Sequence, residues 1–166
     1  MFRKILKPLI AIFGIALVGL AILRFTPLWE NVLPAGDTTK TDFATVTPAD
    51  SPNWFLVCPP DYCLKSKPSL VAPDFPFSPK KLHAALQSLI KEQSDIKILS
   101  ETSTTFELVV RTKWVGWPDH VSIQILPASV SGSTLAIYSR SNYGRSDFDV
   151  NRDRIEGWLL RLTEMN

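Results

Sequence analysis

The side chains best suited to chemistry lie in one polar stretch near the C-terminal end of the chain, residues 139–154. Four arginines alternate there with aspartates, serines and asparagines, just before a helix is expected to begin. The polar residues could cap that helix, with Asp147, Asp149 or Asn151 as the cap, and the arginines could pair with these carboxylates or with Asp119. Alternatively, two or three guanidinium groups and the helix N-terminus could converge on a phosphate or a carboxylate. The sequence is therefore compatible with two interpretations: an ion-paired junction that only fixes the helix on the sheet, and an anion-binding site. The four arginines are Arg140, Arg145, Arg152 and Arg154.

A second candidate is the turn from Trp114 to His120, which contains two tryptophans around a Gly-Pro hairpin. These rings could form the wall of a ligand site, enter a bilayer interface, or cover the end of the core. Asp119 beside His120 could act as a general base. However, no serine, cysteine or second carboxylate stands beside them at a diagnostic spacing, and the common hydrolase, zinc-protease and phosphate-loop motifs are absent. The sequence therefore indicates no catalytic residue. The candidate binding residues of both segments are Arg140, Arg145, Asp147, Asn151, Arg152, Asp119 and Trp117.

The only two cysteines, Cys58 and Cys63, enclose the four residues Pro-Pro-Asp-Tyr. An even count favours a local disulfide if the compartment is oxidising. Closing so small a ring stabilises a fold by about 2 kcal/mol, so its main effect would be to fix a turn. A metal site would need two more ligands, and His83 and His120 are the only histidines. We expect a disulfide, no metal and no cofactor, with free thiols or a redox pair as the alternatives.

The first 26 residues are typical of a membrane anchor. Arg3, Lys4 and Lys7 precede an uncharged apolar run, the pattern of a helix whose positive end stays in the cytoplasm. Residues 5–25 would span about 31 Å as a helix, close to the thickness of the hydrocarbon layer. A cleaved signal peptide would need small residues directly after the run, and none stands there. The sequence predicts a single-pass anchor in a bacterial inner membrane, with the C-terminal domain in the periplasm.

Prolines divide the remaining chain. Ten of the thirteen fall between Pro27 and Pro79, which disfavours regular structure over most of that region. We expect a Pro-rich tether over residues 27–52 and a domain over 53–166, whose first part, 53–77, is an irregular packed segment containing the cysteines.

The overall positive charge belongs to the anchor. Four of the 18 basic residues lie in or beside it, whereas all 16 acidic residues lie beyond it. The exported part is therefore slightly acidic, and nucleic-acid binding loses its main support.

Two helices can be read from apolar periodicity. Ser78 followed by Pro79 is a good N-cap and first helical residue, and a second helix is predicted from about Val150. The stripe of the first helix is Leu82, Ala85, Leu86, Leu89 and Ile90, and that of the second is Ile155, Leu159 and Leu162, with Trp158 beside it.

Between these helices the apolar residues alternate with polar ones, which predicts an antiparallel sheet with one buried face. The alternating segments are 96–98, 106–111, 121–125 and 135–137. The expected fold class is α+β: a four-stranded antiparallel sheet with two helices on one face, in the order helix, four strands, helix.

The C-terminal stretch also resembles a known family. Its Ser-Arg-Ser, Gly-Arg-Ser-Asp and Asn-Arg-x-Arg elements are similar to the signature of a bacterial and plastid family catalogued as domain of unknown function 1499. The segment from Asn53 to Cys63 and the turn at Trp117-Pro118-Asp119 are weaker matches. The resemblance covers residues 53–162, and Asp149 departs from it where a glycine would be expected. It implies an envelope protein with no assigned activity.

These observations favour a membrane-tethered, non-catalytic envelope domain that binds a protein, a lipid or a cell-wall component. One alternative is an anion or small-molecule binding module that uses the arginine cluster. A second alternative is a hydrolase or transferase built around Asp119. An enzyme is the less expected outcome, because no catalytic constellation accompanies that carboxylate.

Overall fold

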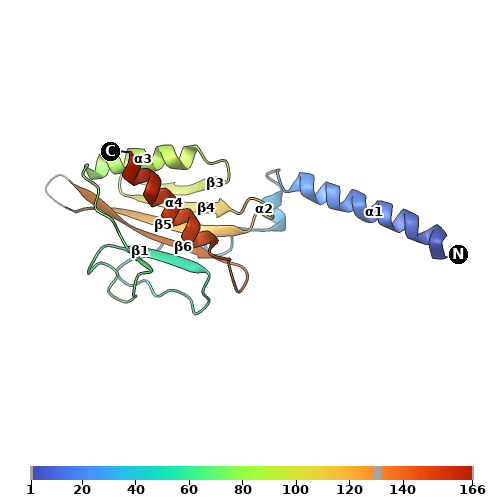
Figure 1. Ribbon diagram of the computed structural model, residues 1–166, viewed down its shortest axis with the longest axis horizontal. Helices are drawn as coiled ribbons and strands as arrows, with labels where there is room; N and C mark the ends of the chain where they lie inside the picture. Colours follow the sequence, from blue (N-terminus) through green and yellow to red (C-terminus); the bar gives the residue numbers. More distant parts are fainter. Residues whose placement is uncertain (1, 129–131, 166) are drawn as a thin grey trace.

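A computed structural model of the chain describes residues 2–128 and 132–165. The first residue of the predicted anchor, and residues 129–131 and 166 of the predicted domain, lie outside the described part. Helix α1 (Phe2–Leu23) projects from one end of an α+β domain, next to the short helix α2 (Trp29–Val32) (Figure 1). One six-stranded sheet, in the order β2-β1-β6-β5-β4-β3, forms the domain together with two helices. The strands are β1 (Trp54–Cys58), β2 (Leu70–Val71), β3 (Ile96–Glu101), β4 (Thr105–Arg111), β5 (Pro118–Pro127) and β6 (Ser133–Ser141), and the helices are α3 (Pro79–Lys91) and α4 (Val150–Glu164).

Helix α1 contains an 18-residue stretch, Leu6–Leu23, that is long and apolar enough to cross a membrane. None of this stretch is buried against the rest of the chain. An exposed apolar helix of this length is compatible with a membrane anchor, and a signal sequence would pass the same test.

Both predicted domain helices are confirmed. The hydroxyl of Ser78 accepts a hydrogen bond from the backbone amide of Lys81, with Pro79 as the first helical residue of α3. The two predicted stripes are buried and pack into one core cluster, on the face of the sheet that both helices cover (Figure 1).

The four predicted strands are present as β3 to β6, but the prediction of a four-stranded sheet is wrong. Strand β1 pairs antiparallel with β6, and β2 pairs parallel with β1. Both lie in the segment 53–77, for which proline density predicts irregular structure. The error has a physical reason: the window from Trp54 to Cys58 lies between Pro52 and Pro59 and contains no proline itself. Nor does it alternate, since Phe55 to Cys58 are all buried.

The second face of the sheet is covered too, so the prediction of one buried face is also wrong. Phe43 and Cys63 form a smaller apolar cluster with residues of β1 and β6. Strand β4 is buried on both sides as a result, including the carboxylate of Glu107.

The Pro-rich segment 27–52 supplies much of this cover. The Ser122 and Thr41 hydroxyls are hydrogen-bonded at 2.9 Å, and the Trp54 indole donates to the carbonyl of Ala49 at 2.9 Å. The sequence predicts a Pro-rich tether over these residues, and in the structure Asp37, Thr41 and Ala49 of this segment contact the strands.

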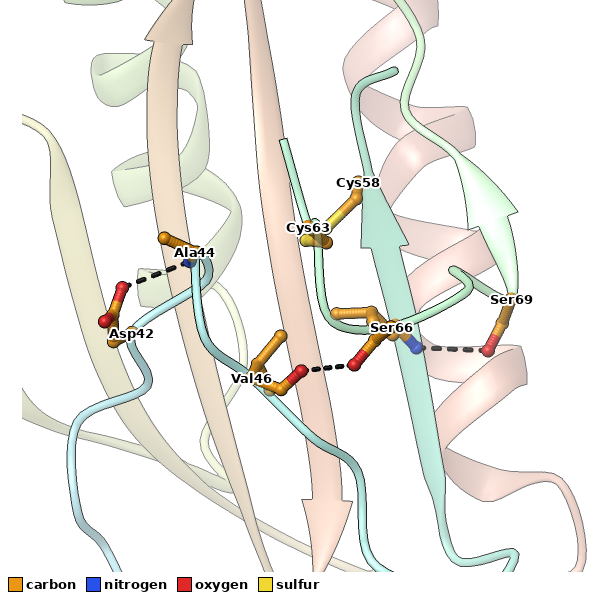
Figure 2. Close-up of a disulfide and its surroundings, with 8 residues drawn as sticks. Asp42, Ala44, Val46, Cys58, Cys63, Ser66 and Ser69 are labelled. Carbon is orange, nitrogen blue, oxygen red and sulfur yellow. Dashed lines mark hydrogen bonds between the residues drawn. A yellow bond between two sulfur atoms is a disulfide. The ribbon is translucent and has the colours of Figure 1, made fainter. Parts of the chain in front are cut away.

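The cysteines lie on the same face. Cys58 at the end of β1 and Cys63 in the following loop are at disulfide distance, with Cα atoms 6.1 Å apart (Figure 2). The loop beyond Cys63 turns back under residues 42–46, where the Ser66 hydroxyl donates to the carbonyl of Val46. Farther on, the Ser69 hydroxyl accepts from the amide of Leu56 in β1 at 3.3 Å. The cysteine pair therefore fixes a loop that contacts both Val46, in the Pro-rich segment 27–52, and Leu56, in β1.

The end of the domain next to α1 is fixed by Gly116. Its backbone has φ +78°, which favours glycine, and a Cβ atom there would lie 2.4 Å from Nε of Arg24 and 2.9 Å from Nε1 of Trp29. We expect Gly116→Ala to destabilise the domain by about 1–2 kcal/mol, because alanine is strained in the left-handed conformation and its Cβ displaces the Arg24 and Trp29 side chains. Chemical unfolding of the full chain in detergent measures this.

The matched control is Gly157→Ala, in the middle of α4, where nothing lies within 4 Å of the added Cβ. That substitution is expected to stabilise the helix by about 1 kcal/mol. Equal effects of the two substitutions would contradict the role assigned to Gly116.

Candidate functional site

An ion pair lies beneath the start of α4, between Asp119 of β5 and Arg154 of α4. Nη2 of Arg154 is 2.6 Å from Oδ2 of Asp119, and the two side chains are only 8% and 2% exposed. The other carboxylate oxygen, Oδ1, accepts a hydrogen bond from the Ser141 hydroxyl. Ser141 is opposite Asp119 in the β5–β6 register, so both residues lie on the face that carries α4. A buried charge needs such pairing, and both oxygens of this carboxylate are engaged.

Asn151 joins this pair to three other elements. Its side chain is fully buried, and Nδ2 lies 2.7 Å from Oδ2 of Asp147, 3.0 Å from the Ser141 hydroxyl and 3.3 Å from the carbonyl of Asn53. Its Oδ1 accepts from Nη1 of Arg154 at 2.8 Å and from the Ser139 hydroxyl. One amide therefore connects the start of α4 to β6, to the residue before β1 and to the ion pair. We call these residues the buried network: Asn53, Asp119, Ser139, Ser141, Asp147, Asn151 and Arg154.

Of the three caps that the sequence allows for α4 (Asp147, Asp149 and Asn151), the structure uses the side chain of Asp147. Its Oδ2 accepts from the backbone amide of Asn151 at 3.2 Å, whereas Asp149 stands at the N-cap position without a side-chain hydrogen bond. Phe148 and Asp149 both have positive φ, +53° and +63°. Bulky residues seldom adopt this conformation, so the loop before α4 holds two strained residues in place.

A cleft of about 450 Å³ opens directly above the network. We call it the aromatic cleft, because its walls come from the turn after β4 and from the loop before α4. Trp117 and Tyr143 face each other across these two segments, with ring centroids 5.9 Å apart. The wall residues are Trp114, Val115, Trp117, Tyr143, Phe148 and Val150, and the polar residues at its base include Asp119, Ser141 and Asp147. The two candidate segments of the sequence thus form one site.

The arginines do not converge on this site. Arg140 lies on the opposite face of the sheet, where its Nη2 is 3.0 Å from Asp37. Hydrogen bonds from Thr39, first from its hydroxyl and then from its amide, lower the pKa of Asp37, and Arg140 adds a smaller contribution. Arg152 is 3.7 Å from Asp149 and lies over the ring of Phe55. Arg145 is exposed and forms no ion pair within the described part of the chain. This geometry gives an arginine-based anion site no support.

Asp119 and His120 do not act together either. Successive side chains of a strand point to opposite faces, so His120 lies on the face of the sheet opposite Asp119, where it is fully buried. Its Nε2 is 3.2 Å from Oε2 of Glu107, which also accepts from the Ser122 hydroxyl at 2.6 Å. Among residues 2–128 and 132–165, no group of three or more His, Cys, Asp or Glu side chains is placed to hold a metal ion.

Of the candidate binding residues, Asp119, Asp147, Asn151 and Trp117 are brought together, while Arg140, Arg145 and Arg152 are not. Sequence reasoning omitted four residues of the network from its candidates. Two signals could have found most of them: Ser139 and Ser141 alternate with Arg140, so they share a strand face, and Asn151 and Arg154 are three residues apart, so they share a helix face. The omitted residues are Asn53, Ser139, Ser141 and Arg154.

A family model described as "Protein of unknown function (DUF1499)" matches residues 46–162. The matched range contains the whole buried network and every residue of the aromatic cleft. It also begins before the predicted domain boundary at residue 53, within the segment that covers the second face of the sheet. No curated protein matches the chain.

Proposed function

We propose that this chain, which belongs to the DUF1499 family of proteins of unknown function, is a membrane-anchored, non-catalytic binding module of the cell envelope. Its ligand site would be the aromatic cleft. The observation that carries the proposal is the pairing of exposed aromatic walls with a polar base in a cavity of ligand size.

The state of the polar groups favours binding over catalysis. Both oxygens of the Asp119 carboxylate accept from protein donors, Arg154 and Ser141, and the side chain is only 2% exposed, which gives it little access to a substrate in the cleft. No nucleophile hydrogen-bonded to a histidine is present among the described residues of the cleft. What remains is a rigid polar base beneath aromatic walls.

The compartment is part of the same proposal. The positive residues in the first turns of α1 favour a cytoplasmic N-terminus, and the cysteine pair suits an oxidising compartment. Both are consistent with an inner-membrane anchor and a periplasmic domain. The family match and the apolar helix support an anchored domain without identifying its compartment.

The test is a ligand screen on the full chain in detergent, with membrane lipids, cell-wall fragments and phosphorylated small molecules as probes. We expect at least one of these three kinds of probe to raise the melting temperature of the wild type, and we expect Trp117→Ala to abolish that rise. The matched control is Leu160→Ala, an exposed apolar residue of α4 outside the cleft, which should keep the full rise.

The melting temperature without ligand shows whether each variant still folds. A folded Trp117→Ala protein with an undiminished ligand response would contradict the assignment of the cleft. A screen in which no class raises the melting temperature of the wild type would contradict the binding function itself.

A further inference from the structure

We infer that the aromatic cleft binds the ammonium headgroup of a membrane phospholipid of the phosphoethanolamine type. The inference rests on the proposed function, and it identifies the ligand by charge, shape and place of entry. Three observations carry it: the position of the cleft, the exposure of its walls and the carboxylate at its base.

The turn between β4 and β5, which lines the cleft, lies at the end of the domain from which α1 leaves (Figure 1). Arg24, the residue after α1, donates from Nη2 to the carbonyl of Thr112 at 2.8 Å. Arg111 ties the same turn to α2, donating to the carbonyl of Gly116 at 2.9 Å and to that of Leu33 at 3.0 Å. If α1 is inserted in a bilayer, the turn that carries Trp114 and Trp117 is therefore held next to its surface.

The walls expose apolar rings where a soluble surface would not. Trp114 is 91% exposed, and Phe148 is 86% exposed on a backbone of positive φ. Phe25, which follows α1, is exposed as well. Tryptophan and phenylalanine exposed together beside a membrane helix are typical of side chains that enter the headgroup and acyl boundary. The opening of the cleft thus faces the region where phospholipid headgroups lie.

The interior of the cleft suits a cation. Trp117 and Tyr143 pack against each other in the wall, with ring centroids 5.9 Å apart, and their outer faces, together with Trp114 and Phe148, line the cleft. Aromatic faces attract ammonium groups, and cages of such rings are a known means of binding them. Asp147 lines the cleft, and its hydrogen bonds within the described residues both reach Oδ2, which leaves Oδ1 available as an acceptor for a cation. A phosphoethanolamine group would place its ammonium against Asp147, while its acyl chains stay in the bilayer beside Trp114 and Phe148.

The experiment titrates the full chain, in an uncharged detergent, with three probes while following tryptophan emission. The probes are a short-chain phosphatidylethanolamine, a phosphatidylglycerol with the same chains, and phosphoethanolamine without chains. We expect phosphatidylethanolamine to bind about tenfold more tightly than phosphatidylglycerol, which has no ammonium group for the cage. Phosphoethanolamine without chains should bind more weakly than its lipid, because it makes no contact with the outer rings.

Two variants test the geometry. Asp147→Asn removes the carboxylate, and Trp114→Ala removes an exposed ring whose loss cannot disturb the core; both should weaken phosphatidylethanolamine binding. The matched control is Glu156→Gln, an exposed carboxylate of α4 outside the cleft, which should leave the affinity unchanged.

Equal affinity for the two lipids, or an unchanged affinity in Trp114→Ala, would overturn the ammonium site. Equal affinity for phosphoethanolamine with and without chains would overturn the membrane as its source. If no probe binds while another envelope component still stabilises the wild type through Trp117, the lipid assignment fails and the proposed binding function stands. If no component binds at all, both fail.

Discussion

Asp119→Asn is expected to destabilise the domain by about 3 kcal/mol, because it leaves the Arg154 guanidinium buried without its counter-charge. Most single substitutions cost far less, so a loss of this size is diagnostic of an unpaired buried charge. Chemical unfolding of the full chain in detergent, followed by tryptophan emission, measures it.

Two further variants separate the buried pair from ion pairs in general. Glu92→Gln breaks the exposed pair with Arg161 and should cost about 0–1 kcal/mol. Replacing both partners, Asp119→Leu with Arg154→Met, should recover most of the loss, since apolar residues of similar size need no counter-charge. A loss in Asp119→Asn no greater than that in Glu92→Gln would mean that water reaches Arg154, and the pair would then be exposed in solution.

Asn151→Ala is expected to be at least as severe, with a loss of about 3 kcal/mol or more. The substitution leaves polar groups of four residues without a partner, because the side-chain amide is hydrogen-bonded to Asn53, Ser141, Asp147 and Arg154. A buried polar group left without its partner costs about 1–3 kcal/mol, and several are stranded here at once.

Asn151→Asp separates hydrogen bonding from packing in this network. Aspartate has nearly the same size and can still accept from Arg154, but it replaces the donating Nδ2 by an oxygen facing Asp147. We therefore expect it to be about as destabilising as alanine at neutral pH. Wild-type stability in Asn151→Asp would show that the donor half of the amide is dispensable, and the buried network would lose its central member.

The aromatic cleft shows how far the sequence reaches toward a function. The turn at Trp117 and the stretch around Asp147 stand out by composition alone, and the resemblance to the family signature fell on the same stretch. Their meeting depends on β5 pairing with β6, which brings Asp119 opposite Ser141. No local pattern encodes that register, so the two segments could only be considered separately.

The arginines, by contrast, were grouped by their closeness in the sequence but are separated in the structure. Arg140 and Arg154 look alike in the sequence, yet one lies under the segment at Asp37 and the other is buried against Asp119. Strand alternation could have separated Arg140 from the site. Partners for the other arginines depend on residues far away in the chain, which spacing does not reveal.

The sequence by itself determined the two helices, four of the strands, the apolar N-terminal helix and the family, because each depends on local periodicity, on composition or on a contiguous signature. Only the tertiary structure decided the rest: the pairing of β1 with β6, the covering of the second face by the Pro-rich segment 27–52 and the loop around Cys63, and the buried network beside its cleft. These features are pairings between distant segments, such as Asn53 with Asn151. Their energy comes from burial and from hydrogen bonds that exist only after the chain has folded.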